Sequence, residues 1–139
     1  MFSFKHDVDL VDWEEAALVI ELASLGRKNP EELSAAFSNS SFSLFLYDSG
    51  KLVGTGRVIS DNVFQSVICD MAVLPEYQSP NIAEPFVKEI LKHVKTPGII
   101  LVTSPYTMEF YKKCGFNRLM IAAAGANQLE CNSIFAHLI

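Results

Sequence analysis

The fold is decided by residues 63–103, which read VFQSVICDMAVLPEYQSPNIAEPFVKEILKHVKTPGIILVT. Residues 63–73 predict a long central strand that ends at Leu74-Pro75, because proline lacks the N–H needed to continue a ladder. From Phe86 onward the apolar residues recur with the period of a helix. Residues 99–103 then form a short, fully apolar strand of the kind that is buried on both faces. A strand, a helix and a second strand in this order predict one βαβ crossover.

Before this crossover, the sequence predicts a β-hairpin and two helices. Residues 42–47 form an apolar, aromatic run of strand length, and residues 52–60 pair back after the turn sequence Asp48-Ser49-Gly50. A helix is expected after Asp12 and a shorter one after Asn29, because both residue types accept hydrogen bonds from the first N–H groups of a helix. The chain starts with a weakly alternating segment that can form a further strand.

After the crossover, the sequence predicts one more helix and a return to the sheet. The helix covers residues 108–113 and stops at Gly115, and the chain returns to the sheet near residues 134–138. Antiparallel strands that lead into a single βαβ unit predict an α/β (α+β) fold, a mixed sheet with helices on its faces. The sequence contains no repeat or linker, so we expect residues 1–139 to form a single domain.

The composition fits a globular domain that does not bind nucleic acid. Of the 139 residues, 50% are hydrophobic and 19% are charged, which provides ample material for a core and excludes disorder. The 11 Lys and Arg residues against 16 Asp and Glu residues give a net charge of −5, and no basic run interrupts this balance. A protein that follows phosphate backbones needs the opposite charge.

The cysteines and the N-terminus predict a cytoplasmic protein. Cys69, Cys114 and Cys131 are odd in number, far apart and without the spacing of a metal motif, which suits a reducing compartment. Residues 1–12 lack the basic start and the apolar run of a signal peptide. No stretch approaches the length of a membrane span, so we expect no membrane partner.

Two motifs carry the chemistry. The first, VLPEYQ at residues 73–78, directly follows the long strand, and the second, FYKKCGF at residues 110–116, lies on and after the later helix. In this order they resemble the GNAT superfamily of N-acetyltransferases, whose members carry V-x-P-x-x-Q/R-x-x-G-x-G/A and later F-Y-x-x-x-G-F. The segment Leu52-Val53-Gly54 and Asp70 extend the resemblance. It implies a mostly antiparallel sheet that is splayed at the fourth strand.

The loop between the long strand and the following helix is the implied binding site for acetyl-CoA. Backbone N–H groups at a helix N-terminus form a cradle for a pyrophosphate. By the family pattern, the pantetheine arm pairs with the backbone of Met71, Ala72 and Val73, and Ser104 is a further candidate contact. The segment implied to hold the diphosphate contains Gln78, Ser79, Asn81, Ile82 and Ala83.

The cradle departs from the family pattern at three residues. Asn81 stands where the first motif glycine belongs, although asparagine tolerates positive φ better than most side chains. Pro80 removes one N–H donor. Pro85 either lies inside the helix and forfeits a backbone hydrogen bond, or takes the first helical position and shortens the helix by about a turn. We therefore expect weakened coenzyme A binding, with a non-catalytic GNAT-fold binding or regulatory module as the alternative function.

Tyr111 is the implied catalytic residue. In the family, a tyrosine at this motif position protonates the thiolate of departing coenzyme A, and a phenol with a pKa of about 10 can supply that proton to a thiol with a pKa of about 8.5. The alternative is a core aromatic. No general base is obvious, because Cys69 stands where many relatives carry Glu and Asp70 is expected on the opposite face of the strand. The implied acceptor is a primary amine of a small molecule or peptide.

Two further expectations concern metals and assembly. His6, His93 and His137 share no ligand spacing along the chain, so we expect no metal, and we interpret His93 as a structural histidine. The apolar stretch MIAAAGA at residues 120–126 can either bury in a homodimer or pair as a strand within the chain. Size-exclusion with light scattering distinguishes the two.

Overall fold

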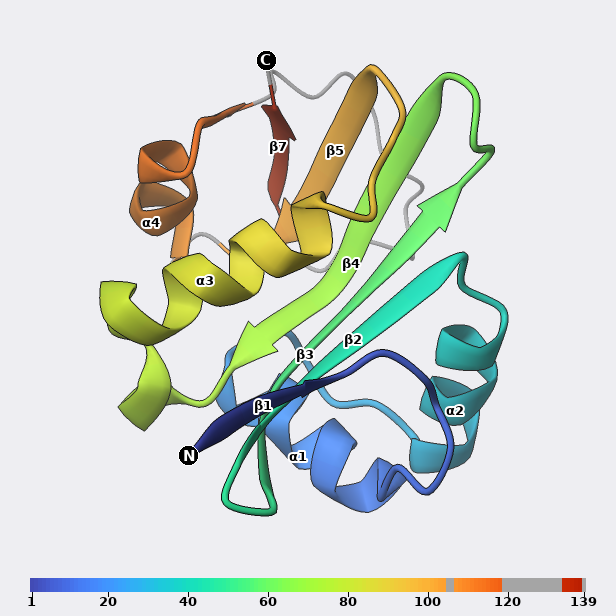
Figure 1. The fold of residues 1–139 in the computed structure, drawn as a ribbon, viewed down its shortest axis with the longest axis vertical. Helices are drawn as coiled ribbons and strands as arrows, with labels where there is room; N and C mark the ends of the chain where they lie inside the picture. The colour runs from blue at the N-terminus through green and yellow to red at the C-terminus, as the bar shows by residue number, and fades with distance from the viewer. Residues whose placement is uncertain (105–106, 119–133, 139) are drawn as a thin grey trace.

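The computed structural model describes residues 1–104, 107–118 and 134–138, in which helices flank a mixed sheet (Figure 1). The strands are β1 (Phe2–Lys5), β2 (Phe42–Asp48), β3 (Lys51–Ser60), β4 (Gln65–Val73), β5 (Gly98–Thr103), β6 (Phe116–Arg118) and β7 (Ile134–Leu138). The helices are α1 (Trp13–Leu22), α2 (Pro30–Ser38), α3 (Pro80–Leu91) and α4 (Met108–Lys113), with the short 3₁₀ helix η1 (Pro75–Tyr77). None of the helices in these ranges is long and apolar enough to span a membrane.

The strand order of the sheet is β1-β2-β3-β4-β5-β7-β6. β4 and β5 are parallel and are joined through α3, and the remaining neighbours are antiparallel. The predicted βαβ crossover and the mixed, mostly antiparallel sheet are therefore confirmed. Residues 120–126, the expected dimer contact, lie outside the described residues.

Different helices cover the two faces of the sheet. In β3, successive residues alternate between these two faces. Gly54 and Gly56 face α3, where Phe86 and Ile90 pack directly against their backbone. Thr55, between the two glycines, and Arg57, after them, point to the other face, where Arg57 reaches Phe37 of α2. The absent side chains of the two glycines thus create the space in which α3 lies against the sheet.

Local capping confirms the predicted starts of the first two helices. The Asp12 carboxylate accepts hydrogen bonds from the N–H groups at the start of α1, and the Asn29 side chain does the same for α2. β4, in contrast, begins at Gln65 rather than at the predicted Val63. The Asp61 carboxylate accepts N–H bonds from residues 63, 64 and 65, which holds the start of this segment in a turn.

The start of α3 decides between the two expectations for Pro85. The helix begins at Pro80, and Pro85 lies inside it. A helix that begins at Pro85 is therefore wrong. Pro80 suits the first turn of α3 because an N–H at this position would have no partner within the helix. The fixed φ of proline is also already helical. Pro85 forfeits one backbone hydrogen bond, but the first turn is kept.

Candidate active site

β4 and β5 diverge at the point where the site lies. Their parallel pairing runs from Gln65 opposite Gly98 to Ile68 opposite Leu101 and stops there. On its other side, β4 remains paired with β3 as far as Val73. Within the described part of the chain, the last residues of β4 therefore have a strand neighbour on one side only.

The backbone groups that face this gap can be identified from the ladder. The N–H of Leu74 donates to the C=O of Val53 on β3, at 2.9 Å. Because N–H and C=O groups alternate between the two edges of a strand, the groups of Ala72 also face β3, whereas those of Met71 and Val73 face the gap. Two side chains donate to these carbonyls: the Tyr111 hydroxyl to Met71 O at 3.4 Å and Gln78 Nε2 to Val73 O at 2.8 Å.

A bulge in β4 produces the divergence. Thr55 lies opposite Ala72 and Arg57 lies opposite Cys69, so two residues of β4 face the single Gly56. The first of them, Asp70, has a φ of +50°. Because the extra residue breaks the alternation, the Asp70 carboxylate reaches Arg57 on the same face as Cys69. The expectation that Asp70 faces away from Cys69 is therefore wrong.

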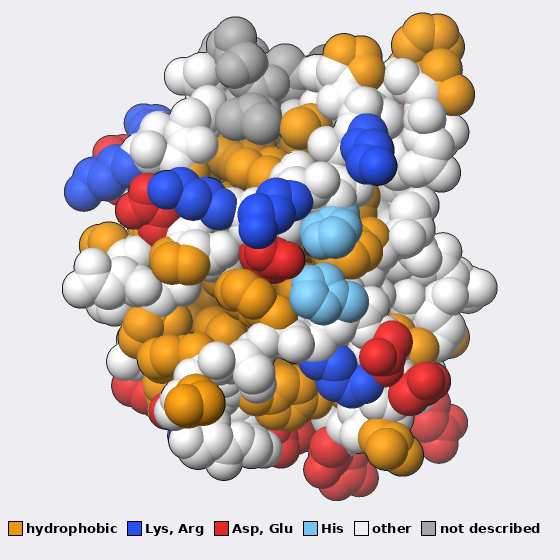
Figure 2. Space-filling view, in the orientation of Figure 1, with side chains coloured by type: hydrophobic (Ala, Val, Ile, Leu, Met, Phe, Trp, Pro, Cys, Tyr) orange, Lys and Arg blue, Asp and Glu red, His pale blue; other side chains and the backbone are white. Residues whose placement is uncertain are grey.

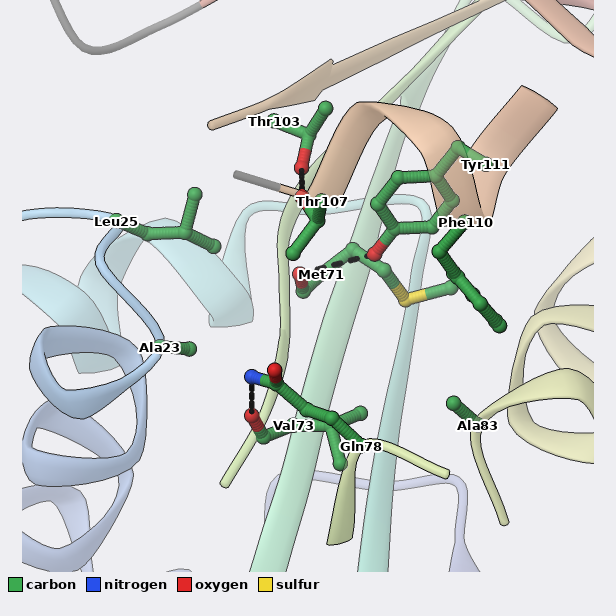
Figure 3. A pocket seen from close by; sticks show the side chains of 10 residues that line it. All are labelled: Ala23, Leu25, Met71, Val73, Gln78, Ala83, Thr103, Thr107, Phe110 and Tyr111. Carbon is green, nitrogen blue, oxygen red and sulfur yellow. Dashed lines mark hydrogen bonds between the residues drawn. The ribbon is translucent and has the colours of Figure 1, made fainter. Parts of the chain in front are cut away.

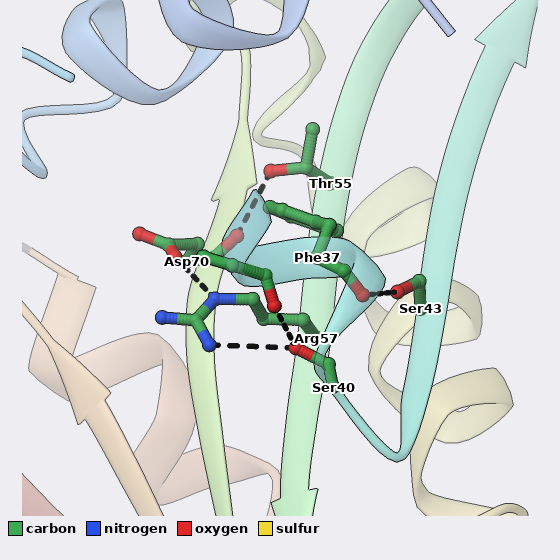
Figure 4. Close-up of polar contacts among 7 residues, drawn as sticks. Phe37, Ser40, Ser43, Thr55, Arg57 and Asp70 are labelled. Carbon is green, nitrogen blue, oxygen red and sulfur yellow. Dashed lines mark hydrogen bonds and ion pairs between the residues drawn. The ribbon is translucent and has the colours of Figure 1, made fainter. Parts of the chain in front are cut away.

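Polar contacts hold this bulge in place (Figure 4). Arg57 Nε donates to Asp70 Oδ2 at 2.7 Å, with both side chains largely buried, and Thr55 Oγ1 donates to Asp70 O at 2.8 Å. Arg57 also reaches Ser40 Oγ at 3.4 Å, and its guanidinium lies 5.9 Å from the centre of the Phe37 ring. The shape of β4 is thus tied to the C-terminal end of α2.

A cavity of about 220 Å³ opens where the two strands diverge (Figure 3). Its wall combines the gap-facing edge of β4 with α4, the first turn of α3 and the segment after α1. The lining residues are Ala23, Leu25, Met71, Val73, Gln78, Ala83, Thr103, Thr107, Phe110 and Tyr111. The cavity offers amide and hydroxyl groups within an otherwise apolar wall, and none of its lining side chains is charged.

Tyr111 places its hydroxyl inside this cavity from α4. Its side chain is buried, and this burial raises the pKa of the phenol well above its usual range. The Thr103 and Thr107 hydroxyls, 2.7 Å apart, lie at the same wall. Because burial disfavours the phenolate, the hydroxyl stays protonated at neutral and mildly alkaline pH.

The N-terminus of α3 lies beside the cavity and presents few free donors. The N–H groups of Ile82 and Ala83 donate to Ser79 O, at 3.1 and 2.9 Å, and Pro80 has none. The N–H of Asn81 has no partner within the described residues. The first turn of α3 therefore keeps the Asn81 N–H without a partner among the described residues, together with the positive end of the helix dipole.

The comparisons with known proteins agree with this geometry. The family model for the acetyltransferase (GNAT) domain matches residues 18–126. The chain belongs to the GNAT acetyltransferase family. The uncharacterized N-acetyltransferase ycf52 of Pyropia yezoensis is 29% identical over 93 residues, which are 62% of this chain and 53% of that protein. The chain thus spans about half the length of this relative.

Solved structures show the same fold. The protein SA2161 of methicillin-resistant Staphylococcus aureus has a TM-score of 0.79 at 25% identity, covering 94% of this chain and 100% of its own. The GNAT family protein SP0256 of Streptococcus pneumoniae has a TM-score of 0.75 at 26% identity, covering 93% and 100%.

The structure brings half of the residues expected in the GNAT site together. Met71, Val73, Gln78, Ala83 and Tyr111 line the same cavity. Ser79 and Asn81 are exposed at the start of α3, with Ile82 half-buried beside them. Two other candidates lie outside the cavity wall. Ala72 turns its backbone to β3, and Ser104 is fully buried, its Oγ without a partner in the described ranges.

Sequence reasoning missed several members of the cavity wall. Thr103 is the last residue of β5, and Thr107 directly precedes α4. Phe110 directly precedes Tyr111 in the motif. Ala23 and Leu25 come from the segment after α1, which no local pattern connects to the motifs. A sequence signal exists only for Phe110, as the first residue of FYKKCGF.

Proposed function

We propose that the protein is an N-acetyltransferase that moves the acetyl group of acetyl-CoA to a primary amine by direct attack. The observation that carries the proposal is the protonated, buried Tyr111 hydroxyl beside the gap-facing carbonyls of β4. The cavity gives this hydroxyl room for a reacting group.

The residues present fit acetyl-CoA in two respects. The pantetheine arm is an uncharged chain with amide groups, and the gap-facing backbone of Met71 and Val73 offers amide partners in an uncharged cavity. Gln78 must release the Val73 carbonyl for this pairing, because it now donates to it. The diphosphate would lie at the N-terminus of α3, where Asn81 offers its backbone N–H and an exposed side chain.

The chain's own residues divide the work as follows. When bound, acetyl-CoA supplies the acetyl group as a thioester, and attack by the amine forms the C–N bond as the C–S bond breaks. Tyr111 donates its proton to the leaving sulfur; its raised pKa keeps the phenol protonated but makes it a weaker acid, so the transfer depends on the hydroxyl lying close to the sulfur. The segment after α1, with Ala23 and Leu25 in the cavity wall, would contact the acceptor.

The amine proton has no dedicated acceptor in the described part of the chain. The Asp70 carboxylate is engaged by Arg57, and burial raises the pKa of the Cys69 thiol, so neither is a free base at neutral pH. We therefore infer that the amine arrives uncharged and loses its proton to water, and that Tyr111 regains its proton from water before the next turnover. A small-molecule amine and a peptide amine both satisfy this requirement.

A transfer assay tests the proposal. The protein is incubated with acetyl-CoA and amines of three kinds: a polyamine, a peptide with a free N-terminus, and an N-terminally blocked peptide with one lysine. We expect acetylation of at least one kind, measured by mass spectrometry, with one coenzyme A thiol released per acetyl group. Thiol release that is independent of every amine, or no product with any of them, would favour the non-catalytic module.

A further inference from the structure

We propose that His6, Glu89 and His93 form a binding site for a divalent transition-metal ion, with Zn²⁺ as the representative. The ligand atoms of the three side chains all lie within 4.8 Å of one another. His6 Nε2 is 3.2 Å and His93 Nε2 is 3.7 Å from the same Glu89 oxygen, Oε1. Figure 2 shows two histidine side chains next to each other on this face of the molecule.

The separations are close to those that a metal imposes. Zn²⁺ binds imidazole nitrogen and carboxylate oxygen at about 2.0–2.2 Å in a tetrahedron, so two ligand atoms on one ion lie about 3.3–3.6 Å apart. Side-chain rotations that move the ligand atoms by about 1 Å therefore suffice to bring all three onto one ion. Two imidazoles and one carboxylate are ligands that suit Zn²⁺, Ni²⁺ and Cu²⁺, not Mg²⁺ or Ca²⁺.

The fold positions each ligand. Glu89 lies in the last turn of α3, and His93 follows two residues after the helix ends at Leu91. Their four-residue spacing brings the two side chains together, with His93 Nε2 3.7 Å from Glu89 Oε1. His6 directly follows β1, whose pairing with β2 brings it to the same place. The ring of His93 is stacked on Phe42 with centroids 4.1 Å apart, and the His6 ring lies 5.9 Å from Phe42.

The cluster is accessible and is separate from the acetyltransferase cavity, with which it shares no residue. Side chains of both histidines are about two-fifths exposed, which leaves room for water on the remaining coordination positions. Lys92 Nζ lies 3.1 Å from Glu89 Oε2, the oxygen that the histidines do not approach. Lys92 therefore pairs with the carboxylate without occupying the oxygen that faces the proposed site.

An ion at this site would connect two parts of the chain that are 83 residues apart. It would join the end of β1 to α3, the helix whose N-terminus lies at the proposed diphosphate site. Because the unfolded chain does not bring these residues together, binding would stabilise the folded state. Spacing along the chain does not reveal this site, because its ligands come from two distant segments.

The test is calorimetric titration of untagged protein with ZnCl₂ and NiCl₂, with MgCl₂ as the comparison ion. We expect one Zn²⁺ per chain with a dissociation constant below about 100 µM, no Mg²⁺ binding, and a rise in melting temperature with Zn²⁺. His6→Gln, Glu89→Gln and His93→Gln are each expected to weaken Zn²⁺ binding at least about tenfold.

The matched control is Glu84→Gln, which removes an exposed carboxylate from the same helix and leaves the three ligands intact. This control should bind Zn²⁺ like the natural protein. Melting curves without metal identify any variant that fails to fold, in which case the other two variants carry the test. Absence of saturable Zn²⁺ binding, or binding that persists unchanged in all three ligand variants, would overturn the proposal.

Discussion

Tyr111→Phe is expected to lower kcat for acetyl transfer by about 100-fold or more, the range found for positioned general acids. The hydroxyl lies in the cavity wall beside the gap-facing edge of β4, next to the proposed path of the thioester. Without it, the sulfur must leave as an unprotonated thiolate or take a proton from water. The KM for acetyl-CoA should stay within about threefold, because the substitution retains the ring that packs in the wall.

The substitution should leave the fold intact, since the hydrogen bond from the hydroxyl to Met71 O is long, at 3.4 Å. Tyr47→Phe is the matched control: it removes a phenol hydroxyl from β2, outside the cavity, and should leave kcat unchanged. Steady-state kinetics with the best amine of the panel measure both variants. A kcat for Tyr111→Phe within threefold of the natural value would mean that Tyr111 is a core aromatic and not the acid.

Phe86→Ala is expected to lower the free energy of unfolding by about 3–5 kcal/mol. The side chain is fully buried and fills the space above Gly54, where its Cε1 would be 3.5 Å from a Cβ at that position. Truncation leaves a cavity under α3 that neighbouring residues cannot fill, because the sheet below it is backbone. Urea denaturation monitored by circular dichroism gives the change.

Glu84→Ala is the control for this stability measurement. Glu84 lies in α3 two residues before Phe86, and its contact is an exposed ion pair with Lys88 at 3.3 Å. Exposed pairs of this kind contribute well under about 1 kcal/mol, so the variant should unfold almost like the natural protein. A cost below about 1 kcal/mol for Phe86→Ala would contradict the packing of α3 on the two glycines.

The parts of the fold that the sequence predicts are those set by local chemistry. The side chains of Asp12 and Asn29 cap their helices as expected, and the turn at residues 48–50 joins two antiparallel strands. The prediction fails at Asp70, where a bulge reverses the facing of one side chain. No residue type in β4 predicts this bulge, because the bulge depends on how β4 pairs with Gly56 of β3.

The candidate site divides in the same way. Tyr111 and Gln78 were predictable because a family motif marks them, and the structure places both at one cavity. Leu25 was not, since its position depends on how α1 packs against the sheet. The cluster of His6, Glu89 and His93 is the clearest case of a site that the sequence does not reveal. Only the fold brings these residues together, so no spacing along the chain marks them.

Calorimetric titration of ligand-free protein with acetyl-CoA tests the central claim most directly, with the double variant Pro80→Gly/Asn81→Gly measured alongside. We expect one site per chain with a dissociation constant of about 10–100 µM, weaker than low micromolar because Pro80 removes a donor. Restoring that N–H should tighten binding about tenfold, the effect of one hydrogen bond to a charged group. Absence of binding by both proteins at about 1 mM acetyl-CoA would contradict the claim that this cavity holds the acetyl donor.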